Sequence, residues 1–283
     1  NCMEQNAAGN QNTAVGTRAL TNNTTADDNT AVGNDALYQN TTGAQNTAVG
    51  SLALDANTTA SYNTAIGYES LTANTTGIYN VGCGRYSLRA NTGGDNNTAL
   101  GQGALSSNTT GDHNTAVGYL ALSSNTDLHG HTAVGYNALT ANTTGLYNTA
   151  VGFEAAHTST DRNQITAIGY KALWLATGHA NTAVGFEAMG NGVASSGYNT
   201  AVGRDCLHDL TTGGENTAVG YAAGFDLTTG VRNTLMGNTA GANLTTGNNN
   251  ICIGMESLFT MTGGHDNVAI GKGALYTSNH TSD

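Results

Sequence analysis

Three histidines form the main cluster with metal-binding chemistry: His113, His129 and His131, with Asp112 and Asp127 nearby. Neutral imidazoles are common ligands of transition metals, and carboxylates often complete such sites. No dedicated spacing such as HExxH or CxxC accompanies these histidines. We therefore expect exposed turn residues here, keep a metal site as the weaker alternative, and predict no cofactor.

Aromatic side chains recur at an almost constant spacing in the middle of the chain. If successive copies stack, their rings contact one another and stabilise an edge of the structure. An exposed strip of this kind also suits binding to a sugar or to a second chain. Both interpretations stay open, and the strip is our candidate ligand or partner surface: Tyr119, Tyr136, Phe153, Tyr170 and Phe186.

No set of residues indicates catalysis, and we predict that the protein is not an enzyme. The serines and histidines are scattered, and the acidic residues lie mostly in turn-forming segments, so no pair of facing carboxylates is expected. The four cysteines, Cys2, Cys83, Cys206 and Cys252, are too far apart in the repeats described below for bridges within one chain. We expect small buried thiols, with a bridge between chains through Cys2 or Cys206 as the alternative.

The composition excludes several partners. The 283 residues include 8 Lys and Arg against 19 Asp and Glu, a formal charge of −11, so nucleic acid and anionic membranes are disfavoured. No apolar run of about 18 residues occurs, which argues against membrane insertion. The chain has 39 glycines and no proline, and the absence of proline suits a backbone whose every N–H takes part in a hydrogen-bond ladder.

A glycine preceded by a Thr-Ala-Val-like triplet recurs along the whole chain. The spacing is 17 residues, except that Gly169 to Gly185 is 16 and Gly185 to Gly203 is 18. With this glycine as repeat position 0, the consensus is G-x-x-A-L-x-x-N-T-T-G-x-x-N-T-A-V. The anchor glycines are Gly16, Gly33, Gly50, Gly67, Gly84, Gly101, Gly118, Gly135, Gly152, Gly169, Gly185, Gly203, Gly220, Gly237, Gly254 and Gly271.

Two short apolar patches, A-L and T-A-V, alternate in each repeat with turns rich in Asn and Gly. Such a unit cannot bury a face alone, but stacked copies can. We predict an all-β fold: a parallel β-solenoid, or β-roll, of about 16 rungs of 17 residues with two short strands per rung. We treat residues 1–283 as a single domain with irregular rungs between Gly169 and Gly203.

Substitutions among the repeats predict which positions face the interior. Position 16 is always apolar, and position 14 lies two residues earlier on the same strand face, so both are expected in the core. Position 4 is usually Leu, and inward Asn at position 7 would stack as an amide ladder. The predicted core ladders are Val15, Val32, Val49, Val117 and Val134; Leu37, Leu54, Leu122 and Leu139; and Asn40, Asn57, Asn74 and Asn142.

Two further features refine this interpretation. In repeats where position 4 is Gly224 or Gly241, position 7 is Leu227 or Leu244. The side-chain volume lost at position 4 is thus expected to be replaced at position 7. Positions 3 and 15 hold almost only Ala. Either the rung is thin and its two walls pinch together there, or a second and third copy of the chain approach these positions closely.

The motif NTAVGYxALxxNTTGxxNTAVG resembles the repeats of tail-fibre-type proteins of bacteria and phages, over essentially the whole chain and with the same period. Its strand motif is more distantly similar to the heads of YadA-like trimeric autotransporter adhesins, whose repeat is shorter. The resemblance implies an extracellular, elongated, homotrimeric β-rod, left-handed as in the adhesin heads. It lends no catalytic residues to this chain.

These observations predict a structural fibre segment with an adhesive role, outside the cell, on a cell surface or on a virion. The expected partners are copies of the chain itself, in a homotrimer or in a head-to-tail filament formed by unpaired end strands, and surface glycans. One alternative is a glycan-binding adhesin module that uses the aromatic strip. Another is ice binding through threonines at positions 8 and 9, although ice-binding solenoids place an inward residue between two outward threonines.

Overall fold

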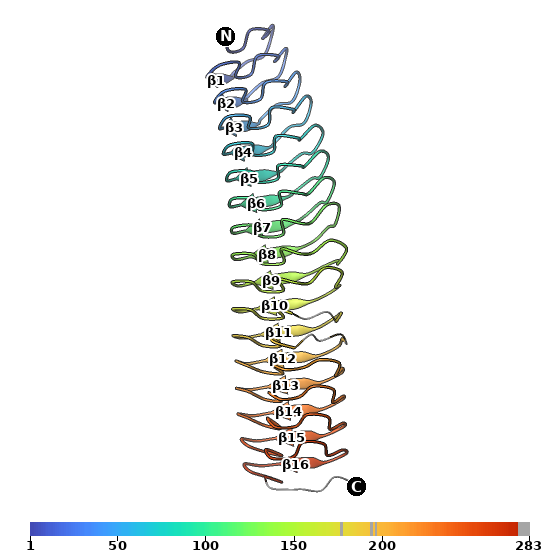
Figure 1. The fold of residues 1–283 in the computed structure, drawn as a ribbon. Helices are drawn as coiled ribbons and strands as arrows, with labels where there is room; N and C mark the ends of the chain where they lie inside the picture. The colour runs from blue at the N-terminus through green and yellow to red at the C-terminus, as the bar shows by residue number, and fades with distance from the viewer. Residues whose placement is uncertain (176–177, 193–194, 196, 277–283) are drawn as a thin grey trace. The chain divides into compact units, whose positions relative to one another are not determined.

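The structure, a computed structural model, describes residues 1–175, 178–192, 195 and 197–276. These residues form sixteen β-strands of three residues each and no helix. The chain divides into two compact units, Asn1–Thr144 and Gly145–Asp283. Each unit is a parallel β-solenoid, which confirms the predicted fold class (Figure 1).

Every repeat contributes its T-A-V triplet as one strand, and each strand pairs in parallel with the next one in its unit. Equivalent residues lie side by side, as Val117 and Val134 do. The first unit contains β1 (Thr13–Val15), β2 (Thr30–Val32), β3 (Thr47–Val49), β4 (Thr64–Ile66), β5 (Val81–Cys83), β6 (Thr98–Leu100), β7 (Thr115–Val117) and β8 (Thr132–Val134). The second contains β9 (Thr149–Val151), β10 (Thr166–Ile168), β11 (Thr182–Val184), β12 (Thr200–Val202), β13 (Thr217–Val219), β14 (Thr234–Met236), β15 (Ile251–Ile253) and β16 (Val268–Ile270).

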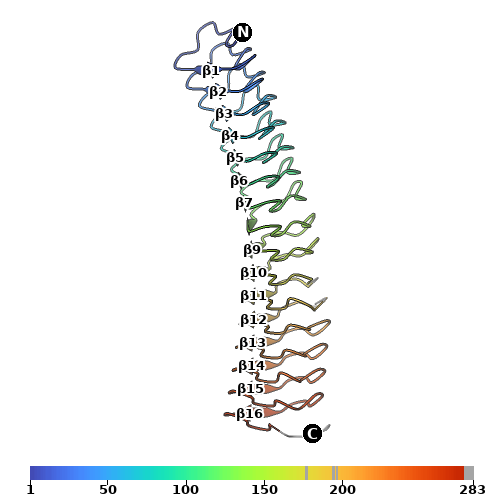
Figure 2. The same ribbon diagram turned by 60° about the vertical axis from the view of Figure 1, so that its left-hand side comes forward.

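Each rung has one strand, not the two that the sequence predicted, because the A-L patch forms a turn (Figure 2). Its leucine adopts a left-handed conformation, with φ of 50° at Leu37. The hydrogen-bond ladder nevertheless continues through the turn. The N–H of Leu37 donates to the carbonyl of Ala53 in the next rung (3.0 Å), whereas that of Asp35 donates to Thr17 in the previous rung (3.0 Å).

The anchor glycine follows the strand at a sharp bend. At Gly33, φ is +141°, a conformation that residues with a side chain rarely adopt. A Cβ added there would lie 2.4 Å from the carbonyl oxygen of Gly50. Conformation and space therefore both require glycine at position 0.

The interior is lined by position 4 leucines and position 7 asparagines, as expected. Leu37, Leu54, Leu122 and Leu139 are fully buried, and so are Asn40, Asn57, Asn74 and Asn142. From Asn23 to Asn125 the amides form a ladder in which each Nδ2 donates to Oδ1 of the preceding rung, at 2.9 Å from Asn57 to Asn40. The same Nδ2 also donates to a turn carbonyl, that of Ala60 (2.9 Å).

A second buried amide column, at position 13, was not predicted. The backbone N–H of Asn46 donates to Oδ1 of Asn29 in the preceding rung (2.9 Å). Its Nδ2 donates to the carbonyl of Ala60 (2.9 Å), which also accepts from Asn57. Two amide columns thus converge on one turn carbonyl per rung, and these bonds pair the buried Nδ2 groups of both columns.

The predicted valine core is wrong. Side chains alternate along a strand, and it is position 15 that faces inward: Ala48 is fully buried, whereas Val15 is 57% exposed. Val32, Val49, Val117 and Val134 are half-buried, on the outer face of their strands.

Alanine occupies the inward position because the rung is thin. A Cβ added at Gly82, at position 15, would lie 2.6 Å from Oγ of Ser70, at position 3 across the rung. The two walls therefore pinch together at these positions, and Ala36, at position 3, is fully buried. Of the two interpretations of the small residues, the structure supports the thin rung.

The glycines at position 4 are compensated from a neighbouring strand. A Cβ added at Gly224 would lie 2.6 Å from the Leu235 side chain, and one added at Gly241 would lie 2.9 Å from it. Leu235 replaces the usual inward alanine and is fully buried. Leu227 and Leu244 are also fully buried, but Leu235 is the side chain that approaches both glycines most closely.

Candidate functional site

The outward side chains of the strands, at positions 14 and 16, form a continuous ladder in each unit, here named the Thr/Val face. Position 14 is Thr in most rungs and position 16 is a variable apolar residue. These side chains are half-buried or exposed, with Ile66 and Met236 each 41% exposed. In the first unit the face comprises the first and last residues of β1–β8, and in the second unit those of β9–β16.

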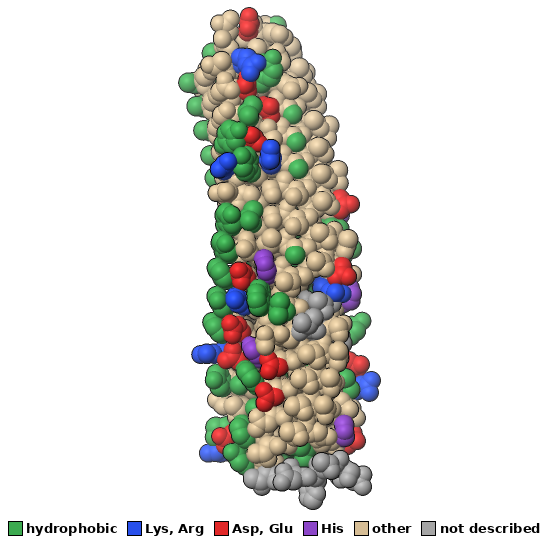
Figure 3. Space-filling model, in the orientation of Figure 1, with side chains coloured by type: hydrophobic (Ala, Val, Ile, Leu, Met, Phe, Trp, Pro, Cys, Tyr) green, Lys and Arg blue, Asp and Glu red, His purple; other side chains and the backbone are tan. Residues whose placement is uncertain are grey.

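The Thr/Val face carries no Asp, Glu, Lys or Arg, although the whole chain has a formal charge of −11. The charged side chains belong to other repeat positions, and they are sparse on the surface shown in Figure 3. A periodic, uncharged and partly apolar surface is typical of the centre of a protein interface.

Rings of the predicted aromatic strip stack within each unit. The rings of Tyr119 and Tyr136 stack in the first unit at 5.2 Å. In the second unit Phe153 stacks on Tyr170 at 5.4 Å, and Tyr170 on Phe186 at 4.9 Å. Because the rings lie face to face, neighbours cover the faces on which a sugar would stack, and the columns mainly stabilise the edge of the rungs.

The structure does not bring the histidine cluster together as a metal site. His131 is buried at position 13, its Nε2 3.3 Å from Nδ2 of Asn142. His129 is exposed, and its Nδ1 accepts the backbone N–H of Asp112 (2.9 Å). His113 is exposed on the adjacent turn. Within the described residues no group of three His, Cys, Asp or Glu side chains could hold a metal ion.

Histidine at position 11 has a structural role that explains its recurrence. Nδ1 of His179 accepts the backbone N–H of Asn163 (3.2 Å), and Nδ1 of His265 accepts that of Asn248 (3.1 Å). Aspartate, asparagine and serine serve as the acceptor in other rungs, as Asp95 does for Ile78 (2.7 Å). Where position 11 carries an acceptor, that side chain therefore pairs a turn N–H that the backbone ladder leaves unpaired, whereas other rungs hold Ala44, Ile78 or Leu146 there.

The threonines at position 8 are also structural. The hydroxyl of Thr41 donates to the carbonyl of Thr58 in the next rung (3.0 Å), and that of Thr228 donates to Thr245 (3.0 Å). These hydroxyls extend the ladder between rungs and are not a free array of donors. The geometry gives no support to ice binding through positions 8 and 9.

The four cysteines are free thiols. Cys206 and Cys252 are buried, and burial raises the pKa of each thiol to about 12. The buried Cys206 is therefore unavailable for a bridge between chains. Cys2 is exposed, and Cys83 lies half-exposed on the Thr/Val face.

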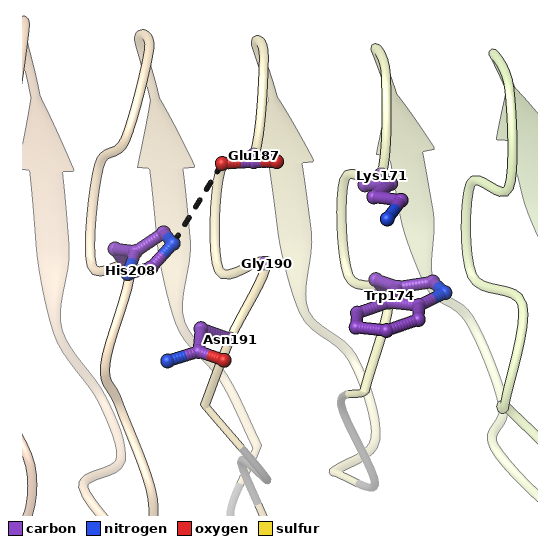
Figure 4. Close-up of a pocket in the computed structure, with 6 residues that line it drawn as sticks. All are labelled: Lys171, Trp174, Glu187, Gly190, Asn191 and His208. Atoms are coloured by element: carbon purple, nitrogen blue, oxygen red, sulfur yellow. Dashed lines mark ion pairs between the residues drawn. The ribbon is translucent and has the colours of Figure 1, made fainter.

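A pocket of about 270 Å³ lies in the second unit, in the irregular rungs, and the sequence analysis did not identify it. Figure 4 shows Trp174 and His208 on opposite sides of the rung that carries Glu187, Gly190 and Asn191. Lys171 completes the lining. The change of spacing to 16 and then 18 residues was the signal that marked this region.

Comparison with known proteins finds no matching family model and no matching curated protein. Across the described part of the chain, the structure has no helix of the length and hydrophobicity that a membrane span requires.

Proposed function

We propose that this protein is a structural segment of an extracellular fibre, on a cell surface or a virion, in which three copies of the chain associate through their Thr/Val faces. The observation that carries the proposal is the uncharged, partly apolar outer face of the strands on an otherwise acidic chain. The resemblance to tail-fibre-type repeats favours three copies and an extracellular place.

A second copy of the chain suits this face better than an unrelated partner. The face repeats with every rung, so an identical chain offers the same period of hydroxyls and apolar side chains along the contact. Few charges need to be desolvated, because the Asp, Glu, Lys and Arg residues lie at other positions. Burying half-exposed Val, Ile, Leu and Met side chains would supply the hydrophobic driving force.

Replacing Val117 and Val134 by Glu tests the proposal, because the two carboxylates would lie in the centre of the contact. We expect the native chain to sediment as a trimer and the double variant as a monomer with an unchanged circular dichroism spectrum. The control is Thr110→Glu, at an exposed turn position, which should stay trimeric. A native chain that stays monomeric at all concentrations, or a double variant that still assembles, contradicts the proposal.

The Thr/Val face also favours a second candidate function, ice binding. Thr115-Ala116-Val117 presents two outward side chains that flank one inward residue, the arrangement that positions 8 and 9 lack. Parallel pairing in register repeats these side chains at the spacing of neighbouring strands, roughly 4.8 Å. Hydroxyl and methyl groups in such an array would order water next to the sheet.

An ice-recrystallisation assay separates the two functions. A monomeric native chain that inhibits recrystallisation, and loses this activity in the Val117→Glu, Val134→Glu variant, would assign the face to ice. A trimer without inhibition assigns it to self-association. Thr110→Glu again serves as the control, since it leaves the face unchanged.

A further inference from the structure

The pocket arises where one ring is missing from an aromatic column. Position 5 in the second unit holds Trp174, Gly190, His208, Phe225, Phe259 and Tyr276 among its residues. In two pairs of successive rungs the rings of this position contact: His208 and Phe225 at 4.9 Å, Phe259 and Tyr276 at 5.3 Å. Gly190 has no side chain, so the column is interrupted between Trp174 and His208.

Hydrogen bonds in the preceding residues define the order of these three rungs. The N–H of Leu173 donates to the carbonyl of Ala188 (3.0 Å), and that of Met189 donates to Cys206 (2.9 Å). Trp174 directly follows Leu173, and Gly190 directly follows Met189. His208 lies two residues after Cys206. The gap between the two rings is therefore one rung wide, and the distances of the stacked pairs show that one ring occupies such a space.

Polar groups surround the gap on the remaining sides. Oε2 of Glu187 lies 3.9 Å from Nε2 of His208, whose Nδ1 lies 2.7 Å from Oδ1 of Asp209. Nδ2 of Asn191 donates to the same Asp209 oxygen (3.2 Å), which orients its amide. In Figure 4 Glu187 and Asn191 lie on opposite sides of Gly190.

The charges around the pocket select against an anion. Carboxylates of Glu187 and Asp209 contact His208, and Nζ of Lys171 already lies 3.7 Å from Oε2 of Glu154. The same ammonium lies 4.3 Å from the centre of the Trp174 ring. An incoming carboxylate or phosphate would meet more negative than positive charge, so an anionic ligand is disfavoured.

We propose that this pocket binds one neutral pyranose ring, the terminal sugar of a glycan, between the Trp174 indole and the His208 imidazole. Hydroxyls both donate and accept, which matches an acceptor-only carboxylate at Glu187, the mixed amide of Asn191 and the donor Lys171. The volume of about 270 Å³ is near the lower end for small-molecule pockets, which suits one ring and not an oligosaccharide. This inference is independent of self-association through the Thr/Val face.

Intrinsic fluorescence gives a direct test, because Trp174 is the single tryptophan of the chain. The full chain is titrated with methyl glucoside, methyl galactoside, methyl mannoside and methyl N-acetylglucosaminide. We expect a saturable change of emission with at least one of them, at millimolar concentration, as a single small contact surface allows. N-acetylneuraminic acid, which is anionic, and phenol, which is aromatic, should produce none.

Variants identify the site. His208→Ala and the isosteric Glu187→Gln should each weaken binding about tenfold or more, because each removes one wall or one acceptor. Phe259→Ala, in the same column but outside the pocket, should bind as the native chain does. The Val117→Glu, Val134→Glu variant should also bind normally, which separates this inference from the proposed fibre function.

The following results would overturn the proposal: no fluorescence response to any of the four glycosides, a stronger response to N-acetylneuraminic acid or phenol, or binding unaffected by both His208→Ala and Glu187→Gln. Circular dichroism accompanies each variant. If His208→Ala loses its fold, Glu187→Gln alone decides, since it keeps the shape of the side chain while it removes the charge and replaces one acceptor oxygen by an NH2 donor.

Discussion

The two units fill the same interior position, position 7, with different residues. In the first unit position 7 is Asn from Asn6 to Asn125, and each buried amide donates to the amide of the preceding rung. In the second unit position 7 is Leu at Leu210, Leu227 and Leu244, so this column is apolar there, while the asparagines of position 13 stay buried beside it. The backbone ladder and the strands are the same in both. Replacing the position 7 residue in a single rung therefore leaves side chains in the neighbouring rungs without hydrogen-bond partners. Asparagine and leucine are interchangeable at this position only along a whole column.

The first unit also shows where a polar column stops. Nδ2 of Asn142 lies 3.3 Å from Nε2 of His131, and Oδ1 of Asn125 is buried without a hydrogen-bond partner. His131 stands where position 13 holds Asn in the neighbouring rungs. The histidine in the position 13 column thus coincides with the end of the position 7 amide ladder, because both columns meet at the same turn.

The largest expected difference between the two units is in the reaction rates of their cysteine thiols. Burial raises the pKa of Cys206 and of Cys252 to about 12, so at pH 8 both thiols remain protonated. We expect them to react with iodoacetamide roughly a thousandfold more slowly than the exposed Cys2 of the first unit. Mass spectrometry of labelled peptides measures the rates, and unfolding in guanidinium should equalise them. Equal labelling of the native chain would show that these rungs open readily.

The next largest effect is expected when a polar residue is introduced into the apolar position 7 column of the second unit. In Leu227→Asn, the new Nδ2 can donate to the Gly230 carbonyl, but Oδ1 finds no donor between Leu210 and Leu244. Lost apolar burial and an unpaired carbonyl together should lower the free energy of unfolding by about 3 kcal/mol. Trp174 fluorescence during guanidinium unfolding reports this unit. A loss below about 1 kcal/mol would mean that water enters the column.

The reverse exchange should cost less. Asn57→Leu removes two ladder bonds, leaving Oδ1 of Asn40 unpaired, while Nδ2 of Asn74 keeps its bond to Gly77. We expect a loss of about 2 kcal/mol, since the added apolar surface offsets part of the polar cost. Hydrogen exchange of the amides in the neighbouring rungs measures it. The control Asn125→Leu breaks one ladder bond and should lose about half as much; equal losses would contradict a role for the ladder.

The smallest effect concerns carboxylates at the turns. The pKa of Asp226 is raised by burial and by the charge of Asp209, so its ionised form destabilises the folded chain above that pKa, and the penalty disappears as the pH falls through it. Asp226→Asn should therefore raise Tm slightly at pH 7, and the difference should vanish as the pH falls to 3.8, the ordinary pKa of an aspartate.

Asp55 in the first unit provides the matched comparison. Burial raises its pKa as well, but the hydroxyl of Thr72 donates to it and opposes the shift. Asp55→Asn should gain less than Asp226→Asn when the two are compared by thermal unfolding at pH 7. A larger gain of Tm in Asp55→Asn than in Asp226→Asn would contradict the conclusion that the Thr72 hydrogen bond offsets the effect of burial at Asp55.

The period of the sequence was enough to predict the solenoid, its register and the buried Leu and Asn columns. It was not enough to decide which face of a three-residue strand points inward. The variable apolar residues at position 16 resembled a core, whereas the nearly invariant Ala48 and its equivalents were the inward residues, restricted in size by the opposite wall. Invariance of a small side chain was the better indicator of burial in a rung this thin.

Other features had weaker signals. Leucine seldom adopts positive φ, yet position 4 does so at Leu20, Leu37 and Leu54, because the contacts between rungs outweigh the local preference. The pocket depends on a side chain that is missing at Gly190. Only the brief change of spacing marked that region, and spacing alone does not reveal what the neighbouring rungs place on either side.

The direction of the amide ladder gives the first unit an electrical polarity. From Asn23 to Asn125 every position 7 side-chain amide donates to the amide of the preceding rung, towards the N-terminal end, so the dipoles of these groups add along that column. Strung together in this way they act as the aligned peptide groups of an α-helix do, with one end attracting negative charge and the other attracting positive charge. A purely structural side-chain column therefore also distinguishes the two directions of the molecule.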